Sequence, residues 1–155
     1  MRQAVCVMDK YGTVTFSQSC VMSSVRVHIK LAHFKPNATH AIHIHEFGDM
    51  TEGCKTLGPH YNPAETTHGS MKYPHKPRHA GDLINNFTTD KTGSVEIIYM
   101  DEMLTMFGDN SIVGRSVVIH DGIDDLGCGG NKESLISGNA GARISCGVIG
   151  WKSVK

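Results

Sequence analysis

The sequence predicts an all-β fold, a sandwich or barrel of about eight short strands that carries two long loops. The first observation behind this prediction is that no stretch of a dozen residues repeats its apolar side chains with a clean 3.6-residue helical period. The second is a series of short β-prone segments separated by turn residues. The third is the glycine content, 17 of 155 residues, with many Asn, Asp, Ser and Thr between the segments. The length fits one domain over residues 1–155.

The predicted strands follow one another at short intervals. Residues 2–8 alternate between apolar and polar side chains and end at the turn Lys10-Tyr11-Gly12. Residues 83–88 and 94–100 flank a turn at 90–93, which is typical of two consecutive antiparallel strands. The remaining strands are expected at residues 13–21, 24–32, 39–46, 115–120 and 143–150.

Two long segments lack strand patterning, at residues 47–79 and 121–142. Loops longer than about 12 to 15 residues without structure of their own are uncommon and are often functional. Both segments carry polar and ligand-type side chains, so we expect the functional site there. The glycine-rich run at 127–131 lacks the GxGxxG spacing and opens no predicted helix, which argues against a phosphate-binding loop.

Charge and hydropathy argue against several classes of partner. The 15 basic residues balance the 15 acidic ones, so nothing favours a nucleic acid or a membrane surface. No apolar run approaches the roughly 20 residues of a membrane helix. Met1-Arg2-Gln3 leads directly into a predicted strand rather than a signal peptide. We therefore expect a cytoplasmic protein with no membrane and no nucleic-acid partner.

Histidine is the compositional excess, with ten residues, and imidazole is a common ligand of zinc and copper. His43 and His45 lie in a predicted strand, where side chains two residues apart point to the same face. They can therefore converge on one metal ion while Ile42 and Ile44 fill the core. The five cysteines form no CxxC pair, and in a cytoplasmic protein they favour free thiols or metal ligands over disulfides.

Further candidate ligands lie in or beside the long loops: His60, His68, His79, Asp82 and His120. Four imidazoles without a thiolate suit tetragonal Cu(II), and His60 and His120 would complete such a group with the strand pair. A group that mixes imidazole with a carboxylate suits tetrahedral zinc. Seven ligands make two four-coordinate sites only if His60 bridges both metals through its two ring nitrogens, which a neighbouring cation allows.

Four segments give the chain a specific resemblance to the copper/zinc superoxide dismutase family, almost from end to end. They are His43-Ile44-His45-Glu46-Phe47-Gly48-Asp49, Gly58-Pro59-His60-Tyr61-Asn62-Pro63, His79-Ala80-Gly81-Asp82 and the run from Gly138 to Gly150. The resemblance implies an eight-stranded antiparallel Greek-key barrel. It also implies an oxidoreductase that dismutates superoxide to dioxygen and hydrogen peroxide, with one copper and one zinc per subunit.

Carried over position by position, the family pattern implies a role for each candidate residue. The implied copper ligands are His43, His45, His60 and His120, and the implied zinc ligands are His60, His68, His79 and Asp82. Asp124 matches an aspartate that accepts hydrogen bonds from His43 and His68, one ligand of each metal, and so fixes the orientation of both rings. Arg143 matches the guanidinium that holds the anion beside copper. The shared imidazole of His60 is expected to carry the proton.

The resemblance also implies a disulfide, an assembly and partners. Cys54 and Cys146 match the family's intrasubunit disulfide, which is unusual in the cytosol. A homodimer is expected because residues 112–114 and 148–150 match segments at the family's interface, although the tail at 151–155 is atypical. Superoxide is the implied substrate, and a copper chaperone is a further expected partner.

The chain departs from the family pattern near the site. Two positions where the family carries lysines that steer the anion hold Gly122 and Ile136, while Lys132 adds a positive charge nearby. We therefore expect weaker steering, with a shallower fall of the rate as salt rises. The stretch between the second and third zinc candidates is longer than usual and contains His75, which we interpret as a solvated loop residue. We interpret Cys128 as a tolerated exposed cysteine.

Two other functions are open on the sequence. A non-catalytic relative would bind metal or a copper chaperone without turnover, but it would need neither all seven ligands nor Arg143. A zinc hydrolase needs an open zinc position and a general base, and the zinc group predicted here is closed. Superoxide dismutation is therefore the leading hypothesis.

Overall fold

Within residues 1–153, eight antiparallel strands form one sheet, in the spatial order β5-β4-β7-β8-β1-β2-β3-β6. The computed structural model describes residues 1–153, so residues 154–155 of the expected domain and of the atypical tail lie outside the described residues. The strands are β1 (Arg2–Val7), β2 (Gly12–Gln18), β3 (Val25–Leu31), β4 (Thr39–His45), β5 (Asn86–Thr88), β6 (Val95–Asp101), β7 (Ser116–His120) and β8 (Arg143–Trp151). The short helical turns are η1 (Asp9–Tyr11), η2 (Gly53–Thr56), η3 (Ala80–Asp82) and α1 (Ser134–Ser137).

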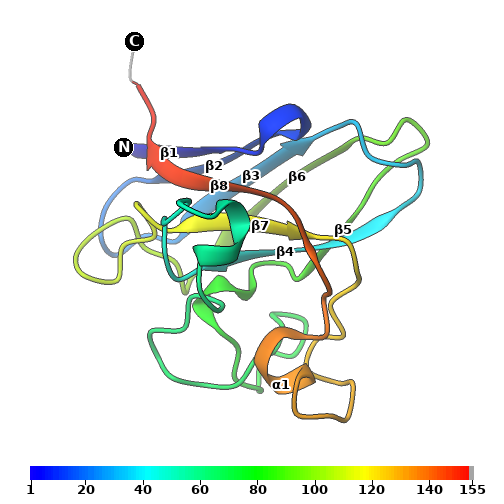
Figure 1. Ribbon diagram of the computed structural model, residues 1–155. Coiled ribbons are helices and arrows are strands. Elements are labelled where there is room, and N and C mark those ends of the chain that lie inside the picture. Colours follow the sequence, from blue (N-terminus) through cyan, green and yellow to red (C-terminus); the bar gives the residue numbers. More distant parts are fainter. Residues whose placement is uncertain (154–155) are drawn as a thin grey trace.

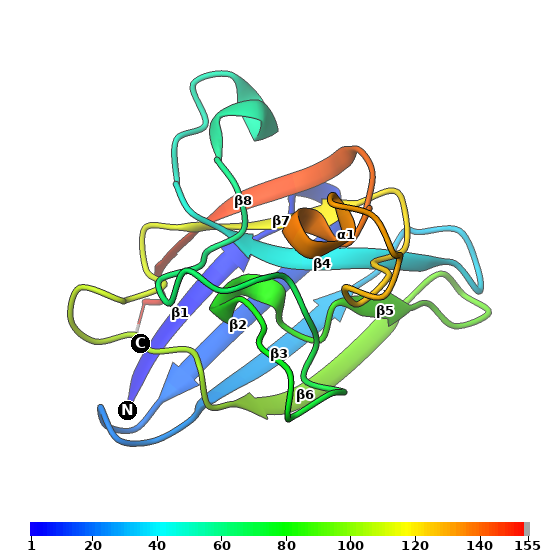
Figure 2. The ribbon, with the colours of Figure 1, turned by 90° about the horizontal axis from the view of Figure 1, so that it is seen from below.

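The sheet curls into a nearly closed barrel with Greek-key connections (Figure 1). Strands β1, β2 and β3 pair in sequence order, whereas β4 pairs with β7, β7 with β8 and β8 with β1. The two end strands, β5 and β6, follow one another in the chain, and Figure 2 shows them beside each other where the barrel nearly closes. The predicted all-β fold and the Greek-key barrel that the resemblance implied are both confirmed.

The core forms because alternate residues of each strand point into the barrel. On β3 the inward side chains Val25, Val27 and Ile29 are fully buried, while Arg26 and Lys30, which point outward, are exposed. Strand β7 differs, since all five of its residues are buried. Its outer face is covered, which indicates that loop segments pack over this side of the barrel.

The two long loops lie on the same side of the barrel. Figure 1 shows the part of the first loop that leads to η3 and the turn α1 of the second loop together, beyond β4. Strand β4 therefore has the barrel core on one face and loop segments on the other, and all residues from Ala41 to His45 are buried. This is the place in the fold where polar side chains of both loops can meet buried strand residues.

The predicted strand boundaries are wrong in two places, for local reasons. The strand expected at 83–88 begins only at Asn86, because Leu83 and Asn85 have left-handed φ values of 49° and 63° that break an extended chain. The strand expected at 13–21 ends at Gln18, where a turn at residues 19–23 follows. The helical turn α1 has four residues, too few to produce a periodic pattern in the sequence.

The expectation of free thiols is wrong for one pair of cysteines, which form the disulfide Cys54–Cys146. This confirms the pairing that the resemblance implied. The other three cysteines are free, with Cys6 buried and Cys20 and Cys128 exposed. Over residues 1–153, no helix has the length and apolar character needed to cross a membrane.

Candidate metal centre

Strand β4 presents two imidazoles to the loop side of the barrel. Ile42 and Ile44 belong to the hydrophobic core cluster, as predicted. His43 and His45 therefore point to the opposite face, where the loops bury them almost completely, with 0% and 2% of their surface exposed. A buried imidazole needs a partner for each ring nitrogen, so the loops that cover this face decide what the two rings can do.

The first long loop brings His60 alongside this end of β4. His60 forms an isolated antiparallel bridge with His45. On either side of the bridge, the amide of Glu46 donates to the carbonyl of Pro59 at 2.9 Å, and the amide of Tyr61 donates to the carbonyl of Ile44 at 2.8 Å. The ring centroid of His60 consequently lies 4.0 Å from that of His43.

Four imidazoles form the first ligand group, and their ligand nitrogens all lie within 4.8 Å of one another. The members are His43, His45, His60 and His120. One nitrogen of each ring is buried without a hydrogen-bond partner: Nδ1 of His43 and Nε2 of His45, His60 and His120. An unpartnered buried polar atom is costly, at about 1–3 kcal/mol each. Four of them gathered at one point fit a single ion with an all-imidazole ligand set, which suits copper.

The remaining nitrogens of the strand-borne rings in this group are fixed by hydrogen bonds. Nδ1 of His45 donates to the carbonyl oxygen of Gly58 at 2.8 Å, and Nδ1 of His120 donates to that of Gly141 at 3.0 Å. Nε2 of His43 donates to Oδ2 of Asp124 at 2.6 Å. Each contact places the ring proton on the hydrogen-bonded nitrogen. The other nitrogen, which has no partner, then keeps a free lone pair.

The second ligand group converges on one carboxylate oxygen. Nδ1 of His60, His68 and His79 lie 3.0, 2.8 and 3.0 Å from Oδ1 of Asp82. The other carboxylate oxygen is held by the amides of Gly69 and His79, at 2.9 and 2.8 Å. Three imidazole nitrogens and one carboxylate oxygen make a closed four-ligand set, which suits tetrahedral zinc. His60 belongs to both groups, through Nε2 to the first and Nδ1 to the second.

Asp124 accepts a hydrogen bond from one imidazole of each group. Its Oδ1 accepts from Nε2 of His68 at 2.7 Å, and its Oδ2 accepts from Nε2 of His43 at 2.6 Å. The side chain is buried, and the amide of Leu126 donates to Oδ1 at 2.7 Å. A single carboxylate therefore sets the orientation of one imidazole in each group.

Residues that the sequence did not indicate hold Asp124 in place. Nδ2 of Asn85 donates to Asp124 Oδ2 at 3.0 Å and to the Gly69 carbonyl at 2.7 Å, while Asn86 Oδ1 accepts from the Asp124 amide at 2.8 Å. Gly138, with a φ of +69°, lies so close that a Cβ there would run into both Asp124 Oδ1 and the ring of His68. The asparagines form no local motif, so no sequence signal could have found them.

The two groups differ in the charge that their side chains carry. Burial lowers the pKa of His43 to about 3 and that of His45 to about 2, and it also lowers the pKa values of His60 and His120. These rings are therefore neutral, the form that binds metal. Burial opposes ionisation of Asp82, but hydrogen bonds from the neighbouring imidazoles hold its pKa well below the usual range. The second group thus contains a permanent negative charge suited to a dication.

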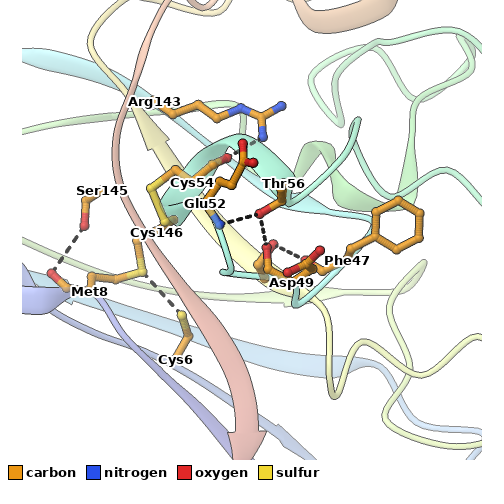
Figure 3. Close-up of a disulfide and its surroundings, with 11 residues drawn as sticks. Cys6, Met8, Phe47, Asp49, Glu52, Cys54, Thr56, Arg143, Ser145 and Cys146 are labelled. Atoms are coloured by element: carbon orange, nitrogen blue, oxygen red, sulfur yellow. Dashed lines mark hydrogen bonds between the residues drawn. A yellow bond between two sulfur atoms is a disulfide. The ribbon is translucent and has the colours of Figure 1, made fainter.

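Arg143 and the disulfide lie at the rim of the first group. Nη1 of Arg143 donates to the carbonyl of Cys54 and Nη2 to that of Gly58, both at 2.7 Å. Figure 3 shows the arginine reaching toward η2, which the Cys54–Cys146 disulfide ties to β8. Gly58 also accepts from His45, so the guanidinium and a ring of the first group share one carbonyl. The arginine is thereby held next to the place where four ring nitrogens meet.

A groove of about 340 Å³ opens beside His60 and His79. Leu135 and Ile136 of the second loop line it, and they are 47% and 45% exposed. The absence of a lysine at position 136 therefore leaves an apolar rim at this point. His75 is exposed and belongs to neither ligand group, consistent with its interpretation as a solvated loop residue.

Comparison with known proteins gives one consistent result. The family model for copper/zinc superoxide dismutase matches residues 10–149. The chain is 48% identical to the Cu-Zn superoxide dismutase of Candida glabrata and 50% identical to that of Yarrowia lipolytica, each over 90% of this chain and 88% of the relative. It is 46% identical to the Cu-Zn superoxide dismutase of Saccharomyces cerevisiae over 97% of this chain and 98% of the relative.

Proposed function

The chain belongs to the copper/zinc superoxide dismutase family, and from this membership we propose that it dismutates superoxide to dioxygen and hydrogen peroxide. The observation that carries the proposal is the double use of His60. Its Nε2 belongs to a group of four orphaned imidazole nitrogens, and its Nδ1 belongs to a closed group around Asp82. One imidazole shared between an open all-nitrogen group and a closed group suits a redox metal linked to a structural one.

We assign copper to His43, His45, His60 and His120, and zinc to His60, His68, His79 and Asp82. When bound, copper supplies one-electron redox chemistry, while zinc has no accessible redox state and supplies charge and geometry. The imidazole of His60 takes up a proton at Nε2 in one half of the cycle and donates it to the reduced oxygen species in the other. The second proton comes from water.

Arg143 is the residue that binds the anion in this proposal. Its fixed, permanently charged fork is anchored by the two carbonyls of Cys54 and Gly58, which leaves its cationic head beside the first group. Asp124 keeps His43 and His68 in ligand orientation. The chain thereby provides the four things the reaction needs: metal ligands, ligand orientation, a proton carrier and an anion site.

The homodimer expected from residues 112–114 and 148–150 is also a proposal. The carbonyl of Gly114 lies against Gly48, and Val148 packs at the same place. Phe47 and Trp151 nearby in the chain are each 53% exposed. Exposed apolar side chains beside two close-packed glycine segments suit an interface between two copies. A single domain, a cytoplasmic location and delivery of copper by a chaperone complete the proposal.

A superoxide-consumption assay on protein loaded with copper and zinc tests the function. We expect fast consumption by the loaded protein and its loss in His120→Ala, which removes one copper ligand but no zinc ligand. A loaded wild-type protein that holds both metals and leaves superoxide untouched would instead support the non-catalytic alternative.

A further inference from the structure

Hydrogen bonds hold the loop around His60 against the end of β4. The amides of Glu46, Phe47 and Tyr61 donate to the carbonyls of Pro59, Leu57 and Ile44, and Nδ1 of His45 donates to that of Gly58. The ring centroids of His45 and His60 lie 5.0 Å apart, so a small shift of the loop changes how both rings face a shared ion. A side chain that contacts both segments would limit such a shift.

The side chain of Arg115 contacts both sides of this bridge. On the β4 side, Nη1 donates to the carbonyl oxygen of Glu46 at 2.9 Å and to its carboxylate at 3.0 Å. On the loop side, the guanidinium lies 3.9 Å over the ring centroid of Tyr61. Glu46 follows His45 in the chain and Tyr61 follows His60, so the guanidinium joins the two segments one residue beyond the ligands.

Arg115 is itself rigidly placed. Its carbonyl accepts from the amide of Ile149 in β8 at 2.8 Å, and its Nε donates to the carbonyl of Ser111 at 3.0 Å. The next residue, Ser116, opens β7 and donates through Oγ to the carbonyl of Phe47 at 2.7 Å. The sheet thus provides the base from which the guanidinium reaches the bridge.

We propose that Arg115 is a positioning residue for the shared imidazole, holding His60 against His45 by clamping Glu46 and Tyr61. The proposal rests on the metal assignment given above and extends it to a residue outside both ligand groups. A partly exposed ion pair contributes little to stability, so its loss should show in the geometry of the ligands rather than in the free energy of unfolding. Lysine cannot replace the arginine, because it lacks the planar fork that binds two oxygens and stacks on a ring.

The test compares Arg115→Lys with wild-type protein, both loaded with copper and zinc. The readouts are the paramagnetic resonance spectrum of Cu(II) and the rate of copper loss to a chelator. Loss of a residue that orients metal ligands lowers metal affinity or activity by about 10- to 100-fold. We therefore expect copper loss at least about 10-fold faster and a changed spectrum in Arg115→Lys.

Two controls separate positioning from general stability. Arg26→Lys makes the same substitution at an exposed arginine on β3, away from the bridge, so it should behave as wild type. Val27→Ala creates a cavity in the core on β3, away from the bridge, and should lower stability without altering the copper spectrum.

Each outcome decides the proposal. If Arg115→Lys keeps the wild-type spectrum and copper-loss rate, the proposal is wrong. If that variant does not fold, Glu46→Gln carries the test: it keeps the backbone contact and weakens only the charged one, and copper loss should rise about threefold. An unchanged rate in a folded Glu46→Gln would then refute the clamp. If wild-type protein fails to bind both metals, the metal assignment fails instead.

Discussion

Nε2 of His68 lies 2.7 Å from Oδ1 of Asp124 at the buried centre of the site. The same carboxylate accepts from His43 through its other oxygen, so the two ligand groups share a carboxylate as well as an imidazole. A change in the geometry of one group can therefore alter the other group through either His60 or Asp124. This connection makes Asp124 the most informative residue to change outside the proposed ligands.

Asp124→Asn should weaken metal binding without removing a ligand. An amide cannot accept strongly from both rings, so His43 and His68 lose their fixed orientation, and the affinity of the second group should fall about 10- to 100-fold. Competition with a chelator for zinc measures the change. Asp109→Asn is the matched control, because Asp109 is exposed and belongs to neither group. Equal zinc affinity in Asp124→Asn and the control would contradict the linking role.

Arg143→Ile should reduce kcat/KM for superoxide and leave metal content unchanged. The guanidinium contributes charge-assisted hydrogen bonds to an anion, each worth about 1.5–3 kcal/mol, which corresponds to about 10- to 100-fold in rate. The kcat/KM of Arg143→Lys should lie between those of wild type and Arg143→Ile, since lysine keeps the charge but loses one of the carbonyl anchors at Cys54 and Gly58. Arg26→Ile on β3 controls for the change in net charge. A rate unaffected by Arg143→Ile would remove the anion site from the mechanism.

Loss of the Cys54–Cys146 disulfide should affect both stability and rate. The bridge closes a chain separation of 92 residues, for which the chain-entropy estimate is about 4 to 5 kcal/mol of folding free energy. The same bridge holds the Cys54 carbonyl that anchors Arg143, so kcat/KM should also fall in the fraction that remains folded. Urea unfolding and a rate assay on Cys146→Ser measure the two effects separately. Cys20→Ser, which removes an exposed free thiol, should change neither.

The metal-free protein should be most stable near pH 6.5. Burial lowers the pKa of His43 to about 3 and of His45 to about 2, so below about pH 6.5 only the unfolded chain takes up these protons and stability falls with acid. Burial would also lower the pKa of His68, but hydrogen bonds with Asp124 and Asp82 raise it to about 9. That contribution is complete below about pH 6.5 and is lost as the pH rises through 9.

Urea midpoints of metal-free protein, measured from about pH 4 to pH 10, check this dome-shaped profile. His43→Gln should flatten the acid side, because one of the rings that resists protonation is gone. His68→Gln should flatten the alkaline side. A midpoint that rises steadily on acidification would contradict the assignment of neutral, buried rings to the first group.

Local pattern was enough to predict the parts of the site that depend on one segment. The two-residue spacing of His43 and His45 in a β-prone run predicted that both face away from the core, and the structure places them so. The absence of a helical period likewise predicted the fold class. The pairing of Cys54 with Cys146 came from the resemblance alone, because the odd number of cysteines and their spacing left the thiols unpaired.

Contacts between distant segments could not be predicted in this way. Asn85 reaches Asp124 across 39 positions, and Arg115 reaches Glu46 across 69. Such contacts depend on how β7 and the loops are brought beside β4, which no window of neighbouring residues encodes. The strand that was expected to begin at residue 83 begins later for a related reason. The chain there leaves η3, which places the carboxylate of Asp82 in the site, and this tertiary arrangement overrides the local β propensity.

The rate of the enzyme should depend less steeply on salt than that of relatives with lysines at the rim, and Ile136→Lys should restore the dependence. Ile136 is 45% exposed and lines the groove beside His60, so a lysine there places a positive charge where the anion approaches. Position 122 is a poorer choice, because a Cβ there would run into the carbonyl oxygen of Ala140. We expect Ile136→Lys to raise kcat/KM several-fold at low ionic strength, with the gain lost as the Debye length shrinks.

Ile98→Lys is the control, because it adds the same charge at an exposed position on β6 and should give a much smaller gain in kcat/KM. If both variants respond to salt alike, net charge rather than the rim controls the encounter, and the apolar rim is not what weakens steering.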